Sequence, residues 1–171
     1  MKETGVIRRI DELGRIVVPK EIRRSLGIKD GEDLEIFVDQ NGIYLKKHSR
    51  IMNYQEMIEQ LRDVTEEEMH LNLCMIDREK VLVSSNGELL NHVNSYQLNK
   101  LLEDREVYES SMKEKLFEDV DFYGYFYIVP IIVSASSIGA IILINEDPLM
   151  SYMKSFVHFL VKLIVKKVDI L

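Results

Sequence analysis

The stretch GVIRRIDELGRIVVPKEIRRSLGIKDGEDLEIFVDQNGIYLKK, residues 5–47, decides the fold of the first part of the chain. Short runs rich in β-branched residues predict four strands, over residues 5–10, 15–18, 34–38 and 43–45. Pro19 and Gly27 delimit a short helix over residues 20–26, because proline suits a first helical turn and glycine suits the position just after a helix. The DQNG sequence of residues 39–42 is typical of a β-hairpin turn.

A unit of this size is too small to fold alone by ordinary core packing. Domains below about 40 residues usually need a disulfide, a metal or oligomerisation, and this unit is barely larger. The chain has a single cysteine, Cys74, which excludes an internal disulfide and a multi-cysteine zinc site. We therefore expect two copies of the unit to build one β-rich core together.

Charge is divided unequally between the two parts of the chain. Residues 1–50 carry eleven Lys and Arg against nine Asp and Glu, whereas residues 51–171 carry eleven against twenty. The net charge of −7 therefore combines +2 in the first part with −9 in the second. Such an asymmetry indicates two functional parts, and the placement of the cations has to decide whether the first one meets nucleic acid.

Beyond the first unit, the sequence predicts a linker helix and a larger α/β domain. The linker helix is expected over residues 51–70, where apolar side chains recur at helical spacing at Tyr54, Met57, Ile58, Leu61 and Val64. The α/β domain is expected over residues 71–171, with strands over 71–76, 81–84, 123–133 and 138–144 and a helix over 95–102. After Pro148 a final amphipathic helix carries apolar positions from Met153 to Leu171 on one face.

The nearly uncharged stretch from Tyr125 to Ile144 has the length of a membrane-spanning helix. Pro130, Gly139 and three serines, together with many β-branched residues, favour two buried strands joined by a turn instead. No charged-then-apolar leader opens the sequence. We therefore expect a cytoplasmic protein, associated with the nucleoid and without a membrane partner.

Six cations are concentrated in the first unit, near the ends of its expected strands and helix: Arg8, Arg9, Arg15, Lys20, Arg23 and Arg24. The planar fork of arginine binds phosphate bidentately and also matches the major-groove edge of guanine. In a dimer each of these side chains is doubled, which would concentrate a strip of positive charge. The alternative is that they form ordinary surface salt bridges with the acidic residues nearby, Glu3, Asp11, Glu12 and Glu21.

Residues 5–47 closely resemble the DNA-binding domain of the AbrB family of transition-state regulators, most specifically in RRIDELGRIVVPKEIRRSLGI, residues 8–28. This resemblance implies a swapped-hairpin β-barrel made by two intertwined chains, in agreement with the size argument. It also implies a set of DNA-contacting residues, Arg8, Arg15, Arg23 and Arg24. Arg9 and Lys20 are further candidates at less closely matched positions.

The stretch YIVPIIVSASSIGAIILINED, residues 127–147, is similar to the paired central strands of GAF domains. An AbrB-type unit followed by such a domain resembles the sporulation regulators of the family. The fold class implied is α+β, with an intertwined N-terminal barrel over residues 1–50. A GAF-like domain with an antiparallel sheet and flanking helices would follow over residues 71–171.

GAF folds often hold cyclic nucleotides or tetrapyrroles, but no ligand site can be placed here from the sequence. The glycines of this part that might cradle a phosphate are isolated: Gly87, Gly124 and Gly139. Tyr123, Tyr125 and Tyr127 alternate on one strand face, which suits core packing or a subunit interface better than a pocket. We expect no cofactor and no metal site, and a small-molecule effector stays an open alternative.

The function these features predict is sequence-selective DNA binding by a regulator of sporulation and transition-state genes, acting as activator or repressor. We expect no enzyme, since no nucleophile–base pair, carboxylate pair or metal box is found. The N-terminal units would form a homodimer on double-stranded DNA, and the linker and final helices would join protomers into a homotetramer. The alternative hypothesis is an antitoxin that represses its own gene and whose C-terminal part binds a partner protein.

Overall fold

The computed structural model describes residues 5–28, 30–117 and 120–168 of the chain. The chain divides into two compact units: unit 1 comprises residues 1–48 and unit 2 comprises residues 49–171.

Unit 1 contains one short helix and one β-hairpin. Helix α1 spans Lys20–Ser25, and strands β1, Leu34–Asp39, and β2, Gly42–Lys47, pair in antiparallel register. The Asp39 carboxylate accepts hydrogen bonds from the backbone N–H groups of Asn41 at 2.7 Å and Gly42 at 3.1 Å, which fixes the hairpin turn. The helix and this hairpin confirm what the sequence predicts for residues 20–47.

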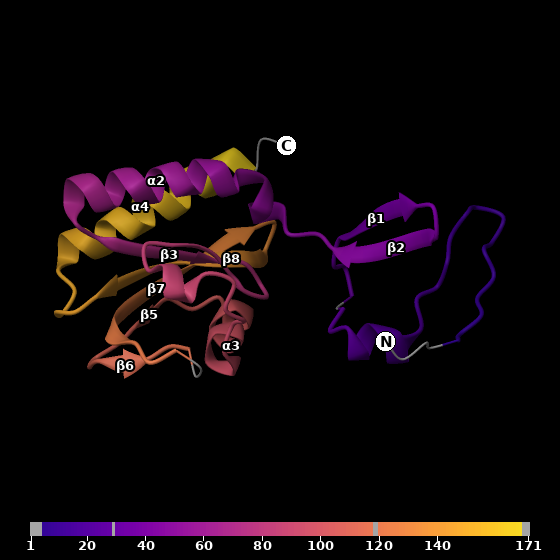
Figure 1. Cartoon of the computed structure of the whole chain (residues 1–171), viewed down its shortest axis with the longest axis horizontal. Coiled ribbons are helices and arrows are strands. Elements are labelled where there is room, and N and C mark those ends of the chain that lie inside the picture. Colours follow the sequence, from indigo (N-terminus) through magenta and orange to yellow (C-terminus); the bar gives the residue numbers. More distant parts are fainter. Residues whose placement is uncertain (1–4, 29, 118–119, 169–171) are drawn as a thin grey trace. The chain divides into compact units, whose positions relative to one another are not determined.

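The two strands expected over residues 5–10 and 15–18 do not form in the single chain, where residues 5–18 run as an extended loop (Figure 1). A strand needs a ladder of hydrogen bonds to a neighbouring strand, and within the described part of the chain no strand pairs with either segment. The sequence predicts these two strands as part of a core built by two copies, and in the single chain they are not observed. The single chain does not contain a closed barrel among its described residues.

Unit 2 is built on a six-stranded antiparallel sheet. Strands β3 (Asn72–Ile76), β4 (Val81–Ser84), β5 (Tyr108–Glu109), β7 (Tyr123–Val133) and β8 (Ser136–Asn145) follow the order β4-β3-β8-β7-β5, and β6 (Glu114–Lys115) also pairs with β7. The long central pair β7–β8 covers the stretch that has the length of a membrane span, and no described helix is long and apolar enough to cross a membrane. The sequence predicts β3, β4, β7 and β8 closely, whereas β5 and β6 were not expected.

Helices cover both faces of this sheet (Figure 1). Helix α2 (Gln55–Met69) and helix α4 (Ser151–Val168) lie side by side on one face, and helix α3 (Tyr96–Asp104) lies on the other. Under α2 and α4 the core includes Ile58, Leu143 and Leu160, while under α3 it includes Leu98 and Phe126. Two 3-10 turns, Arg50–Tyr54 and Gly87–Leu89, complete the unit.

The segment expected to be a linker helix belongs to unit 2. Helix α2 packs on β3 and β4, and the Tyr54 hydroxyl near its start donates a hydrogen bond to the Lys167 carbonyl near the end of α4 at 3.1 Å. An amphipathic helix buries its apolar stripe on the nearest apolar sheet face, which explains this placement. Leu171, the last apolar position expected on the final helix, lies outside the described residues.

Candidate nucleic-acid interface

Arg15 follows a tight turn whose conformation is fixed by Asp11. The Asp11 carboxylate accepts hydrogen bonds from the backbone N–H of Leu13 at 3.0 Å and of Arg15 at 2.8 Å. Its second oxygen accepts a hydrogen bond from the Arg15 Nε at 2.7 Å. Gly14 has a φ of +76°, a left-handed conformation that suits glycine, so the sequence Asp-x-x-Gly-Arg determines this turn locally.

These contacts keep Asp11 charged and leave Arg15 accessible. The hydrogen bond from the Arg15 backbone, followed by the one from its side chain, holds the pKa of the Asp11 carboxyl below its ordinary range. The Arg15 side chain is 72% exposed. The turn therefore presents a fixed cation to solvent.

Helix α1 carries three of the six candidate cations. Lys20 is its first residue, and Arg23 and Arg24 occupy its last turn, where positive charge interacts favourably with the helix dipole. A terminal nitrogen of Arg23, Nη1, forms an ion pair with Asp30 beyond the helix. In this pair Arg23 is partly buried and Asp30 is exposed, while Lys20 and Arg24 are also exposed.

Arg8 and Arg9 lie on the extended segment at the start of unit 1, and both are exposed. Within the described residues, neither has an ion-pair partner. Among the described residues, the salt-bridge alternative applies to two of the six cations, since Arg15 pairs with Asp11 and Arg23 pairs with Asp30. Glu3, another expected partner, lies outside the described residues. Asp30 was not expected as a partner, because seven residues separate it from Arg23 and no periodic pattern links the two.

Unit 1 leaves its apolar side chains uncovered. Pro19 is the one residue of its described part that is buried, and thirteen large apolar side chains are exposed: Val6, Ile7, Ile10, Leu13, Ile16, Val17, Leu26, Ile36, Phe37, Val38, Ile43, Tyr44 and Leu45. Ile36 faces Leu45 and Val38 faces Ile43 across the hairpin, so these four share one face of it. A soluble unit does not expose such a continuous apolar surface unless another surface covers it.

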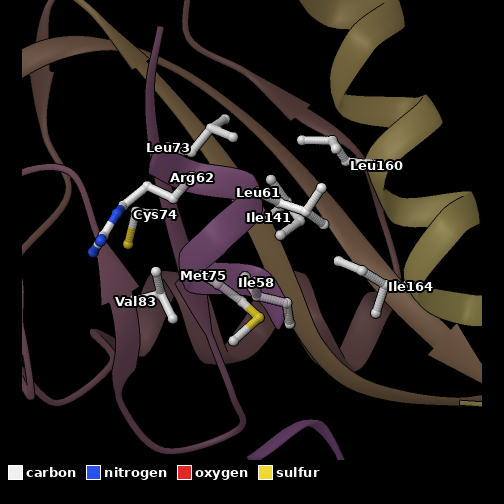
Figure 2. A pocket seen from close by; sticks show the side chains of 10 residues that line it. All are labelled: Ile58, Leu61, Arg62, Leu73, Cys74, Met75, Val83, Ile141, Leu160 and Ile164. Carbon is white, nitrogen blue, oxygen red and sulfur yellow. The ribbon is translucent and has the colours of Figure 1, made fainter. Parts of the chain in front are cut away.

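Unit 2 has a small apolar pocket between α2, α4 and the sheet (Figure 2). Its lining includes Ile58, Leu73, Met75, Ile141 and Ile164, and its volume is about 10 Å³, on the order of one water molecule. Arg62 stands at its edge, where it pairs with Asp63 and donates a hydrogen bond to the Ser84 carbonyl at 3.2 Å. The pocket as described has no room for a nucleotide or a tetrapyrrole.

Of the three tyrosines that alternate on β7, Tyr127 packs in the core. Tyr127 is buried under α4, and its hydroxyl lies 2.8 Å from His158 Nε2, while Tyr123 is exposed. Burial and the neighbouring Glu109 carboxylate raise the pKa of Tyr127. No group of three or more His, Cys, Asp or Glu side chains that could hold a metal ion occurs among the described residues.

Two families match successive parts of the chain. Residues 7–52 match the family described as antidote-toxin recognition MazE, bacterial antitoxin, and residues 53–163 match the family described as stage V sporulation protein T C-terminal, transcription factor. Stage V sporulation protein T of Bacillus subtilis is 37% identical over 157 residues, which cover 88% of each chain. The transition state regulatory protein AbrB of the same organism is 53% identical over 55 residues, which cover 32% of this chain and 57% of that protein.

Solved structures show the fold of unit 2. The GAF domain of a phosphoenolpyruvate-protein phosphotransferase from Acinetobacter superposes with a TM-score of 0.54 at 13% identity, covering 70% of this chain and 87% of that one. A methyl-accepting chemotaxis protein gives a TM-score of 0.55 at 12% identity, covering 70% of this chain and 92% of that one. The expected GAF-like architecture is confirmed, and the α+β class with it.

Proposed function

The chain belongs to the stage V sporulation protein T family of transcription regulators, and we propose that it binds double-stranded DNA through arginines of a dimeric unit 1. Sporulation and transition-state genes are the proposed targets. The observation that carries the proposal is the gathering of six cations within residues 8–24 of a unit that resembles a DNA-binding domain. Unit 2, with its own fold and its acidic charge, would assemble the chains.

The arginines of unit 1 supply the proposed contacts. Arg8, Arg15, Arg23 and Arg24 would meet phosphates and base edges, with Arg9 and Lys20 adding to the positive strip. Phosphates dominate the affinity of such interfaces, so binding should fall steeply with rising salt concentration. Base contacts by the arginine fork would supply the sequence preference.

The apolar face of the hairpin supports a shared core between two copies. Ile36, Val38, Ile43 and Leu45 are exposed in one chain, and a second copy would bury them. Residues 5–10 and 15–18 would then find strand partners in the other chain. In the resulting barrel, every DNA-contacting arginine would occur twice.

Replacement of Arg15 tests the assignment of the interface. Arg15→Ala should weaken binding to a duplex selected by the wild-type chain from a random-sequence pool by roughly tenfold to a hundredfold, because it removes a bidentate contact. Lys113→Ala removes one exposed cation from unit 2 and should leave the affinity within about twofold. Fluorescence anisotropy at fixed salt measures both, and equal affinities for Arg15→Ala and wild type would refute the assignment.

The outer face of α4 supports association of dimers into a tetramer. Phe159 is 60% exposed, and Phe156 stacks beside it at 6.4 Å between ring centroids. Phe159→Lys should convert a tetramer into dimers in light scattering without unfolding unit 2, since its side chain is outside the core. Tyr96→Lys, at an 83% exposed aromatic on α3, is the matched control and should leave the mass unchanged. A wild-type mass of a dimer would refute the tetramer.

The alternatives fit these observations less well. An antitoxin would use its C-terminal part to capture a toxin, but residues 53–163 match a transcription factor and form a domain with its own core. We assign no chemical reaction to the chain and no effector to unit 2; the pocket of Figure 2 admits about one water molecule. A regulator of this kind would act on the nucleoid, in the cytoplasm.

A further inference from the structure

Asp11 contacts Arg15 in a way that distinguishes it from an ordinary surface ion pair. One carboxylate oxygen accepts two backbone N–H groups within the turn, and the other accepts the Arg15 Nε. The turn is also closed by backbone hydrogen bonds from Gly14 N to Asp11 O at 2.9 Å and from Asp11 N to Arg15 O at 3.1 Å. The carboxylate is therefore fixed in place before it meets the guanidinium.

The nitrogen that Asp11 engages is the one nearest the chain. A guanidinium has five N–H donors, and binding through Nε leaves the four on Nη1 and Nη2 pointing away from the stem. Among the described residues, neither terminal nitrogen of Arg15 has a hydrogen-bond partner. These terminal donors can bind a phosphate or the edge of a guanine.

Two other aspartates of unit 1 provide the contrast. Asp30 contacts Nη1 of Arg23, so it occupies the outer end of that guanidinium. Asp39 makes the same kind of turn as Asp11, with two backbone N–H groups bound to one carboxylate oxygen, but no cation is paired with it among the described residues. Of these three aspartates, Asp11 both accepts the turn hydrogen bonds and accepts a hydrogen bond from an arginine Nε.

We propose that Asp11 is a positioning residue for DNA binding, which holds Arg15 by Nε so that its terminal nitrogens face a phosphate or a base edge. The proposal rests on the proposed function, because it presupposes that Arg15 contacts DNA. An aspartate that only lay near the duplex would repel phosphates, and its removal would strengthen binding. A positioning aspartate has the opposite effect, so the sign of the change decides between the two roles.

The test compares Asp11→Asn with Asp39→Asn in the full chain, using the duplex selected by the wild type from a random-sequence pool. Both variants lose one negative charge, and in both the amide oxygen can still accept the turn hydrogen bonds. Asp11→Asn should weaken binding roughly threefold to tenfold, because a charge-assisted hydrogen bond to Nε is lost. Asp39→Asn should bind as the wild type does or slightly tighter.

Two further measurements separate positioning from folding. In the Arg15→Ala background, Asp11→Asn should cause no additional loss, since nothing remains to be positioned. The Nε–H resonance of Arg15 in the free protein should shift in Asp11→Asn and stay in place in Asp39→Asn. Circular dichroism should show equal folding of the two variants.

The outcomes separate the positioning role of Asp11 from the DNA contact of Arg15. Binding by Asp11→Asn that equals or exceeds the wild type, while Arg15→Ala binds weakly, overturns the positioning role alone. Equal weakening by Asp39→Asn also overturns it, because turn stability would then explain both losses. An Arg15→Ala variant that binds as the wild type does removes the DNA contact itself, and the proposed interface with it.

Discussion

Units 1 and 2 differ in whether their apolar side chains are buried within the chain. The described part of unit 2 buries thirty-three hydrophobic residues within its own chain, whereas in the described part of unit 1 Pro19 alone is buried. Both units nevertheless have well-defined local structure, with a hairpin and capped turns in unit 1. Unit 2 therefore completes a core within its own chain, whereas unit 1 would do so only in the dimer proposed above.

The largest effect should come from a charge on the apolar face of unit 1. Val38 is 76% exposed in the single chain, so Val38→Asp would be harmless if unit 1 acted alone. In a core shared by two copies an unpaired carboxylate costs several kcal/mol, and DNA affinity should fall at least about a hundredfold. Fluorescence anisotropy with the selected duplex measures the loss.

Val93 provides the matched control. It is 75% exposed in unit 2, and Val93→Asp introduces the same charge at a nearly equal exposure. Its DNA affinity and its circular dichroism should stay at wild-type values. If Val38→Asp bound DNA as well as Val93→Asp does, the proposed core shared by two copies of unit 1 would be contradicted.

The sequence predicts those elements whose partners lie nearby in the same chain. The long pair β7–β8 has continuous β-branched runs, and each strand finds its neighbour across a short turn, so the observed bounds nearly match. The two-residue strands β5 and β6 carry no periodic signal, because they form only where β7 offers hydrogen-bonding groups. Residues 5–10 and 15–18 have strand composition, but composition does not say whether the neighbouring strands would lie in the same chain or in another copy.

An intermediate effect should come from a steric clash between two strands of unit 2. A Cβ on Gly139 would lie 2.2 Å from the carbonyl oxygen of Ile76, so Gly139→Ala must push β8 away from β3. We expect a loss of roughly 2–4 kcal/mol in the free energy of unfolding of unit 2, as for severe overpacking. Urea unfolding followed by tyrosine fluorescence measures it.

Gly87→Ala serves as the control for this prediction, because a Cβ there would meet nothing within 4 Å. It should change the stability of unit 2 by less than about 0.5 kcal/mol. A Gly139→Ala variant as stable as Gly87→Ala would contradict the close packing of β8 on β3.

The candidate interface was predictable in its cations but not in the contacts that hold them. Clustered arginines can be recognised in a sequence, so five of the six candidates, and Lys20 beside them, are named from the sequence alone. The roles of Asp11 and Asp30 depend on which guanidinium nitrogen each one reaches, Nε of Arg15 or Nη1 of Arg23. Acidic residues are common on surfaces, and spacing alone does not separate an aspartate that positions a cation from one that competes for it.

The smallest effect should come from Cys74, the single thiol of the chain, which is buried in unit 2. Burial raises its pKa to about 12, so the folded thiol stays neutral at pH values where the unfolded one ionises. Stability is therefore present below the ordinary thiol pKa near 9 and is lost as pH rises towards 12. At pH 10 the wild type should lose about 1 kcal/mol more than Cys74→Ala in urea unfolding, relative to pH 7.

Chemical labelling of the same thiol reports whether unit 2 has unfolded. In wild type at pH 8, a thiol reagent should react with Cys74 only when unit 2 unfolds, because the buried neutral thiol is a poor nucleophile. Val38→Asp would disrupt the proposed shared core of unit 1 and should leave this protection unchanged, whereas Gly139→Ala should speed the reaction. Rapid labelling in Val38→Asp would mean that unit 2 depends on unit 1 for its core, and the contrast between a self-sufficient unit and a shared one would fail.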